Sequence, residues 1–159
     1  VWTIPAGGGK AAPLLVADHT ESDARFSPNG RWVAYVSREA GRPEVWVHSV
    51  SGTARRMVVS GKGGNQPVWC RDSKALYFVD LDGRLQRVEV TWNADRTPSF
   101  GLPVAPPIPR VGFGHWGTQF DISPDGSQIY FMQPDDAKPA SNLQVVINWR
   151  PLLEAAQSD

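Results

Sequence analysis

Cysteine, net charge and long apolar runs are what this sequence lacks. A single Cys among 159 residues excludes an internal disulfide framework and a zinc site built from several cysteines. Sixteen Lys and Arg balance sixteen Asp and Glu, which argues against a nucleic-acid-binding protein relying on bulk positive charge and against an acidic tail protein. No apolar run approaches the roughly 18 residues of a membrane-spanning helix. We therefore expect no nucleic-acid partner and no direct membrane insertion.

Turn-forming residues and large apolar residues are plentiful instead. The chain has 15 Gly and 14 Pro, together with seven Trp, six Phe and three Tyr. This composition disfavours disorder and fits short elements joined by tight turns. The chain opens on Val1-Trp-Thr-Ile4 with no initiator Met and no signal-peptide pattern, which predicts a segment or mature product of a longer protein.

One pattern occurs three times along the chain. Each copy has an apolar residue, a tight polar turn and a strand with an aromatic residue at its centre. The copies are Phe26–Val36, Trp69–Val79 and Ile122–Met132. Corresponding positions lie 43 residues apart between the first two copies and 53 residues apart between the last two. We interpret the additional residues as a loop insertion within the Pro-rich segment Thr97–Pro109.

A second similarity links Val1–Ile4 to Val45–His48, and each is followed by a Gly-containing turn and another apolar segment. The repeating unit is therefore four strands in about 43 residues. A four-stranded sheet cannot bury both of its faces alone, so such units stack around an axis, as in a β-propeller. The sequence predicts an all-β fold, a β-propeller fragment of about three four-stranded antiparallel blades with a short C-terminal helix.

The pattern also predicts how one partial propeller domain, 1–159, is divided. The expected parts are two strands of a blade (1–17), a blade (23–60), a second blade (66–96), a Pro/Gly-rich insertion (97–117), a last blade (118–149) and a short helix (150–157).

The turns carry a resemblance to a known family. Ser27-Pro-Asn-Gly30 and Ser123-Pro-Asp-Gly126, with Glu44-Val-Trp-Val47, resemble the WD40-like (PD40) repeats of TolB-type β-propellers. The ending Leu143-Gln-Val-Val-Ile-Asn-Trp149 resembles bacterial chains in which such a propeller follows a serine/threonine kinase or a winged-helix regulator. The resemblance spans nearly the whole chain and implies a ring of six blades. The location stays unknown from the sequence, and a kinase context would place the propeller on the extracytoplasmic side. The middle copy, Cys70-Arg-Asp-Ser73, lacks Pro and Gly, so we expect its turn to be built differently.

Half of a six-bladed ring leaves two open blade faces, which a soluble monomer rarely exposes. We therefore expect a second copy of the chain to close the ring as a homodimer. The apolar side chains of the open faces are expected to come from Trp32, Tyr35, Trp46, Tyr77, Phe78, Tyr130 and Phe131.

Motifs for metal, phosphate or nucleophilic chemistry are incomplete. Asp80-Leu-Asp-Gly83 has the spacing of part of a calcium loop, but it lies between two expected strands and is better explained as a hairpin turn. His19, His48 and His115 are far apart, which disfavours a metal pair. Gly-x-Ser-x-Gly and the phosphate-loop spacing are absent. We expect no metal, no cofactor and no catalytic residue.

The residues just before the innermost strands are the candidate ligand-binding residues, because this edge of a propeller faces the central funnel. They are Asp23, Arg25, Asn65, Gln66, His115, Gln119 and Asp121. We expect them to hydrogen-bond a peptide or small polar ligand, in a non-enzymatic interaction or ligand-sensing module of a larger bacterial signalling protein. The alternative is a hydrolase, because similar repeats also gate the prolyl oligopeptidase family. Such an activity would need His115, Asp121 and a nearby Ser or water.

Overall fold

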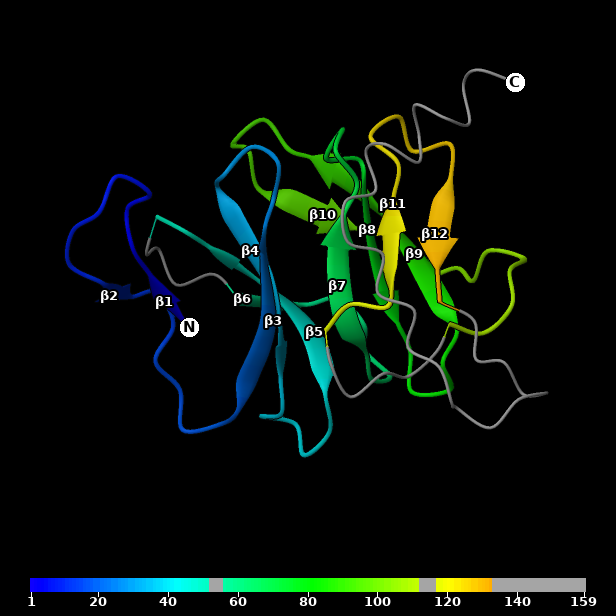
Figure 1. Cartoon of the computed structure of the whole chain (residues 1–159), viewed down its shortest axis with the longest axis horizontal. Coiled ribbons are helices and arrows are strands. Elements are labelled where there is room, and N and C mark those ends of the chain that lie inside the picture. The colour runs from blue at the N-terminus through cyan, green and yellow to red at the C-terminus, as the bar shows by residue number, and fades with distance from the viewer. Residues whose placement is uncertain (52–55, 112–116, 133–159) are drawn as a thin grey trace, which may run out of the picture.

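The computed structural model describes residues 1–51, 56–111 and 117–132, and all regular elements within these ranges are β-strands (Figure 1). They form four antiparallel sheets. The N-terminal pair is β1 (Trp2–Thr3) and β2 (Ala12–Pro13); the first blade is β3 (Glu21–Phe26), β4 (Trp32–Ser37), β5 (Glu44–Ser49) and β6 (Arg56–Val58); the second blade is β7 (Asn65–Trp69), β8 (Ala75–Val79), β9 (Leu85–Trp92) and β10 (Pro98–Phe100); the C-terminal pair is β11 (Phe120–Ile122) and β12 (Ile129–Phe131).

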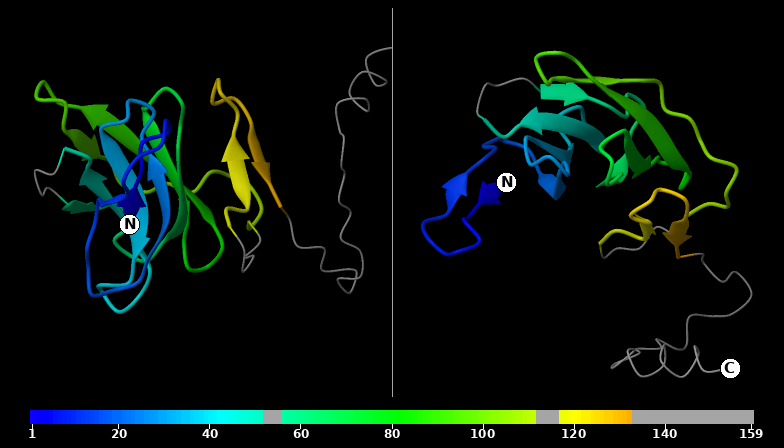
Figure 2. Two further views of the ribbon diagram at one scale, coloured as in Figure 1. Left: turned by 60° about the vertical axis from the view of Figure 1, so that its left-hand side comes forward. Right: turned by 90° about the horizontal axis from the view of Figure 1, so that it is seen from above.

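Consecutive strands are neighbours in each sheet, so both four-stranded sheets are simple antiparallel meanders. Seen from above, the four sheets follow one another along an arc (Figure 2). This confirms the all-β fold and the partial propeller. The expected helix at 150–157 lies outside the described residues. Within the described ranges, no helix is long and apolar enough to cross a membrane.

The repeated turn has the same geometry in all three copies. The side chains of Asn29, Asp72 and Asp125 each accept a hydrogen bond from the backbone N–H two residues further on, at 2.8 to 3.1 Å. The next position has a left-handed backbone, which Gly30 adopts at φ 68° and Ser73 at φ 60°. The expectation of a different turn in the middle copy was therefore wrong, because the Asp side chain holds the turn and Ser tolerates the conformation that Gly prefers.

The two blades bury one apolar core between them. Residues two apart on a strand share a face, so alternate residues of β4 and β5 point at the second blade. The core residues are Trp32, Ala34, Val45, Val47, Val59, Trp69, Leu76, Phe78, Val88 and Val90. A second core, on the other face of the second blade, contains Cys70, Ala75, Tyr77, Val79, Leu85, Val111 and Phe120, with Ile122, Ile129 and Phe131 packed against it.

These cores correct the expected location of the exposed aromatic residues. Trp32 and Phe78 lie between the two blades, and Tyr77 and Phe131 lie between the second blade and the C-terminal pair. Only Tyr130, which is 61% exposed, is left on the open side of the C-terminal pair. For these four residues the expectation was wrong, because both faces of the middle blade are covered. Tyr35 and Trp46 pair with each other on the face of the first blade opposite to the core between the blades.

The second blade also takes a strand from the segment expected to be an insertion. β10 begins at Pro98, directly opposite Trp92 of β9, and Phe100 packs against the core between the blades. A Pro is tolerated there because it is the first residue of an edge strand, where its missing N–H costs no ladder hydrogen bond. The chain then returns along the blade, where Val111 N donates to Gly83 O at 2.8 Å.

Candidate ligand-binding site on the innermost strands

The innermost strands of the two blades share a β-bulge. Asp23 and Gln66, which are 43 residues apart, both have a left-handed backbone, with φ of 52° and 55°. The register of each strand with its neighbour shifts at this point, between Ser22 and Arg25 in β3 and at the matching place in β7. Non-Gly residues rarely adopt this conformation, and bulges re-aim the side chains that follow them. The bulges therefore decide where the polar side chains of these strands point.

Arg25 lies at the centre of the site. Its Nη2 donates to Thr118 Oγ1 at 3.1 Å, although the two residues are 93 positions apart. Its backbone oxygen accepts a hydrogen bond from Trp69 Nε1 at 3.3 Å. These contacts connect β3 to β7 and to the segment that precedes β11.

An open pocket of about 520 Å³ lies beside the three innermost strands. Its lining residues are Arg25, Phe26, Pro28, Val68, Trp69, Arg71, Thr118, Phe120 and Asp121. Two arginines and one aspartate thus line the same pocket, together with Phe26, Trp69 and Phe120. Asp121 is exposed, and its Oδ1 accepts a hydrogen bond from Ile122 N at 2.8 Å. A few polar groups on an apolar wall are typical of small-molecule and peptide sites.

Gln66 and Gln119 have a different environment. Both are buried, and Gln66 Oε1 accepts a hydrogen bond from the backbone N–H of Gln119 at 2.8 Å. The Gln66 carbonyl is therefore engaged in joining the second blade to the C-terminal pair. A buried, hydrogen-bonded amide of this kind positions the strands.

The seven candidate residues are thus divided. Arg25 and Asp121 line the pocket, whereas Asn65 is half-buried in the ladder opposite Val79 and Asp23 accepts a hydrogen bond from Ser22 Oγ at 3.1 Å. His115 lies outside the described residues. Sequence reasoning missed the pocket residues Trp69, Arg71 and Thr118. Arg71 could have been found, because it occupies the turn position that is Pro in the other two copies.

A second polar network lies between the first blade and the loop that precedes β7. Glu44 is buried, and its carboxylate accepts hydrogen bonds from Arg42 Nε at 2.6 Å, Gly63 N at 2.9 Å and the Ser60 hydroxyl. Burial by itself raises the pKa of Glu44, but the hydrogen bonds from Ser60, Arg42 and Gly63 outweigh it and hold this pKa below its ordinary value. The network closes the loop onto the blade.

The described part of the chain does not favour a catalytic cysteine or a metal site. Burial lowers the pKa of His48, and it raises the pKa of the buried Cys70 thiol, which makes this thiol a poor nucleophile. Residues 1–51, 56–111 and 117–132 contain no group of three or more His, Cys, Asp or Glu that could hold a metal ion.

The sequence is similar over part of its length to known β-propeller proteins. No family model matches the chain. The Tol-Pal system protein TolB of Albidiferax ferrireducens is 34% identical over 65 residues, which is 41% of this chain and 15% of that protein. The described strands and this likeness together show TolB-like β-propeller repeats. The crystal structure of TolB from Acinetobacter baumannii aligns with a TM-score of 0.47 and 17% identity, covering 86% of this chain and 43% of that one.

The chain is also similar to part of an enzyme. The lasso peptide isopeptidase of Asticcacaulis excentricus is 30% identical over 93 residues, which is 54% of this chain and 13% of the enzyme. The chain therefore spans a small part of the curated relatives it matches. The further resemblance to propellers that follow bacterial kinases or winged-helix regulators stays a prediction.

Proposed function

We propose that this TolB-like segment is a non-enzymatic interaction module that binds a peptide or small polar ligand in the pocket of its innermost strands. The observation that carries the proposal is the convergence of Arg25, Arg71 and Asp121 from three different strands or turns on one cavity. The hydrogen bond from Arg25 to Thr118 holds part of this arrangement before a ligand arrives. The module would belong to a larger bacterial signalling protein and act on the extracytoplasmic side.

Variants of the pocket test this proposal. The protein is applied to an array of immobilised tetrapeptides, and the best-binding sequences are resynthesised and titrated by calorimetry. Arg25→Ala and Asp121→Ala should each weaken binding by about tenfold or more, because each removes a charged partner of the ligand. Arg38→Ala is the matched control, since Arg38 is exposed and lies outside the pocket. An array without specific binding, or equal affinities for all three variants, contradicts the proposal.

The hydrolase alternative rests on the likeness to the isopeptidase. Among the described residues, neither His19 nor His48 hydrogen-bonds to a serine, so no nucleophile and base are paired there. Turnover of p-nitrophenyl acetate and of the bound tetrapeptides separates the two functions. We expect no turnover above buffer. Turnover that Asp121→Ala abolishes would favour the alternative.

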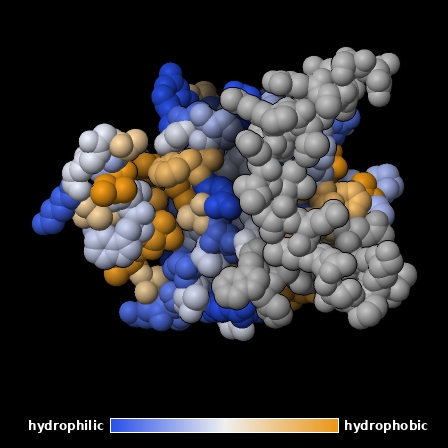
Figure 3. Space-filling view, in the orientation of Figure 1, coloured by the Kyte–Doolittle hydropathy of each residue, from blue (hydrophilic) through white to orange (hydrophobic). Residues whose placement is uncertain are grey.

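We also propose that a second copy of the chain closes the ring as a homodimer. Each end of the described arc is a two-stranded sheet with exposed apolar side chains. Trp2 and Ile4 are 68% and 61% exposed at one end, and Tyr130 and Met132 are 61% and 56% exposed at the other. Figure 3 shows hydrophobic residues gathered around the end that carries β1 and β2. Joining the N-terminal pair of one copy to the C-terminal pair of the other would bury these side chains.

Light scattering tests the homodimer. At micromolar concentration we expect a mass of roughly twice 17.4 kDa. Trp2→Glu and Tyr130→Glu should shift the protein to a monomer, because each places a charge in the proposed contact. Leu102→Glu is the control, since Leu102 is 86% exposed but lies next to β10, away from both ends. A wild-type monomer with a cooperative thermal transition would overturn this part of the proposal.

A further inference from the structure

A second pocket lies between the two blades, at the edge formed by their turns. It has a volume of about 430 Å³ and lies outside the innermost strands. Three segments that are distant in sequence build it: the repeated turn of the first blade, the end of β5 with the residues that follow, and the β9–β10 turn. Its lining residues are Gly30, Arg31, Trp32, Ser49, Val50, Ser51, Asp95, Arg96 and Thr97.

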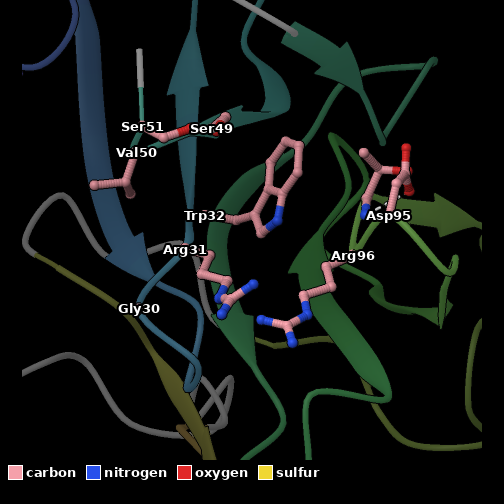
Figure 4. A pocket seen from close by; sticks show the side chains of 9 residues that line it. Gly30, Arg31, Trp32, Ser49, Val50, Ser51, Asp95 and Arg96 are labelled. Carbon is pink, nitrogen blue, oxygen red and sulfur yellow. Dashed lines mark hydrogen bonds between the residues drawn. The ribbon is translucent and has the colours of Figure 1, made fainter. Parts of the chain in front are cut away.

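Two arginine side chains converge on this pocket. Figure 4 shows the guanidinium groups of Arg31 and Arg96 pointing toward each other, although the residues belong to different blades. In the part of the chain that the structure describes, no hydrogen bond or ion pair engages either guanidinium group. Two positive charges that converge in this way repel each other. An anion bound between them would be attracted by both, which would offset the repulsion. Two converging guanidinium groups therefore favour an anionic ligand over a neutral or cationic one.

The other groups of the pocket favour the same kind of ligand. The indole N–H of Trp32 is directed toward the arginine pair (Figure 4), and the indole can only donate. Asp95 is the one acidic residue among the described lining residues, and its carboxylate lies away from the two guanidinium groups. Asp95 Oδ1 instead accepts hydrogen bonds from Thr97 N at 3.0 Å and Thr97 Oγ1 at 2.6 Å. Donors therefore dominate the side of the pocket where the arginines meet.

The backbone holds both arginines in place. The Arg31 carbonyl accepts a hydrogen bond from Val50 N at 2.8 Å, which fixes the turn against the end of β5. Arg96 occupies a left-handed position, φ 64°, in a turn closed by the hydrogen bond from its N–H to Asn93 O at 2.8 Å. Gly would be the less strained residue at this position. The turn therefore has an arginine at a position where the left-handed backbone is strained for any residue that carries a Cβ.

We infer that Arg31, Arg96 and Trp32 form a binding site for a small organic anion that carries a phosphate or carboxylate group. The guanidinium groups bind the anionic group, and the walls of Trp32 and Val50 contact the apolar part of the ligand. The cavity volume lies in the range of small-molecule sites. This site goes beyond the proposed function, because it shares no residue with the pocket of the innermost strands.

The test is an NMR titration of the full chain at 150 mM NaCl with phenyl phosphate, phenylacetate and benzyl alcohol as separate probes. The Nε–Hε resonances of Arg31 and Arg96 should shift in a saturable way with at least one of the two anions, and the neutral alcohol should bind at least tenfold more weakly. The tighter of the two anions identifies the phosphate or carboxylate preference. Absence of saturation with both anions, or equal binding of benzyl alcohol, would overturn the site.

Variants separate loss of the site from loss of the fold. Arg31→Gln and Arg96→Gly should each weaken binding of the anion about tenfold or more, whereas the exposed Arg38→Gln should leave it unchanged. Arg96→Gly relieves the left-handed position, so its melting temperature should equal or exceed that of the wild type. A stable Arg96→Gly protein that binds the anion as tightly as the wild type contradicts the inference. Arg25→Ala should not affect this titration.

Discussion

Replacing Phe78 by Ala is expected to lower the free energy of unfolding by about 3–5 kcal/mol. Phe78 is 1% exposed and lies in the core between the two blades. The ring packs directly against the backbone of Gly64, where an added Cβ would lie 2.7 Å from Phe78 Cδ2. The expected loss of stability has two parts. The folded state no longer gains the free energy of burying the ring, and a cavity remains between two sheets that cannot close it. Because a domain has about 5–15 kcal/mol of stability in all, this is a large fraction.

Urea denaturation measures this effect, and the chain offers a matched control. Phe26→Ala removes the same ring from a position that is 56% exposed, so we expect a loss below about 1 kcal/mol. Equal losses for the two variants would mean that the interface between the blades contributes little to stability, and the two-blade core would then have to be rejected as the basis of the fold.

Removal of the Glu44 carboxylate should have the second-largest effect. In Glu44→Ala, the buried Ser60 hydroxyl and the Gly63 N–H lose their acceptor, and we expect a loss of about 2–3 kcal/mol at pH 7. Glu39→Ala is the control: Glu39 pairs with Arg56, but its side chain is 41% exposed, so its removal should cost under about 1 kcal/mol. Chemical denaturation of both variants decides the comparison. A Glu44→Ala protein as stable as Glu39→Ala would show that the network is not stabilising.

The pH dependence of stability gives an independent test of Glu44. Because the pKa of Glu44 is lowered in the folded state, its contribution is fully present above the unfolded pKa of about 4.3 and is lost as the pH falls through the lower folded pKa. The stability difference between the wild type and Glu44→Gln should therefore shrink as the pH falls below about 4.3. Asp125, whose pKa is lowered to about 2 chiefly by the hydroxyls of Ser123 and Ser127, is present in both proteins and cancels.

The class of fold could be predicted from the sequence, because the features that encode it are local. The Asx-held turn needs only Asn or Asp followed by a residue that tolerates a left-handed backbone, and Asn29-Gly30 and Asp125-Gly126 supply both. Apolar and aromatic residues after each turn then mark a strand, and the period of about 43 residues marks a four-stranded unit. Local turn chemistry even holds in the middle copy, where Ser73 replaces Gly.

Which residues meet, by contrast, depends on how the strands and blades pack. A strand has two faces, and the register and the bulges at Asp23 and Gln66 assign each side chain to one of them. The pocket of the innermost strands depends on this assignment, since Arg25 and Thr118 are 93 residues apart and meet only because the blades are arranged around an axis. The same reason explains the pair of Arg31 and Arg96. Each lies in an ordinary turn by sequence, and the packing of one blade against the next brings them to one cavity.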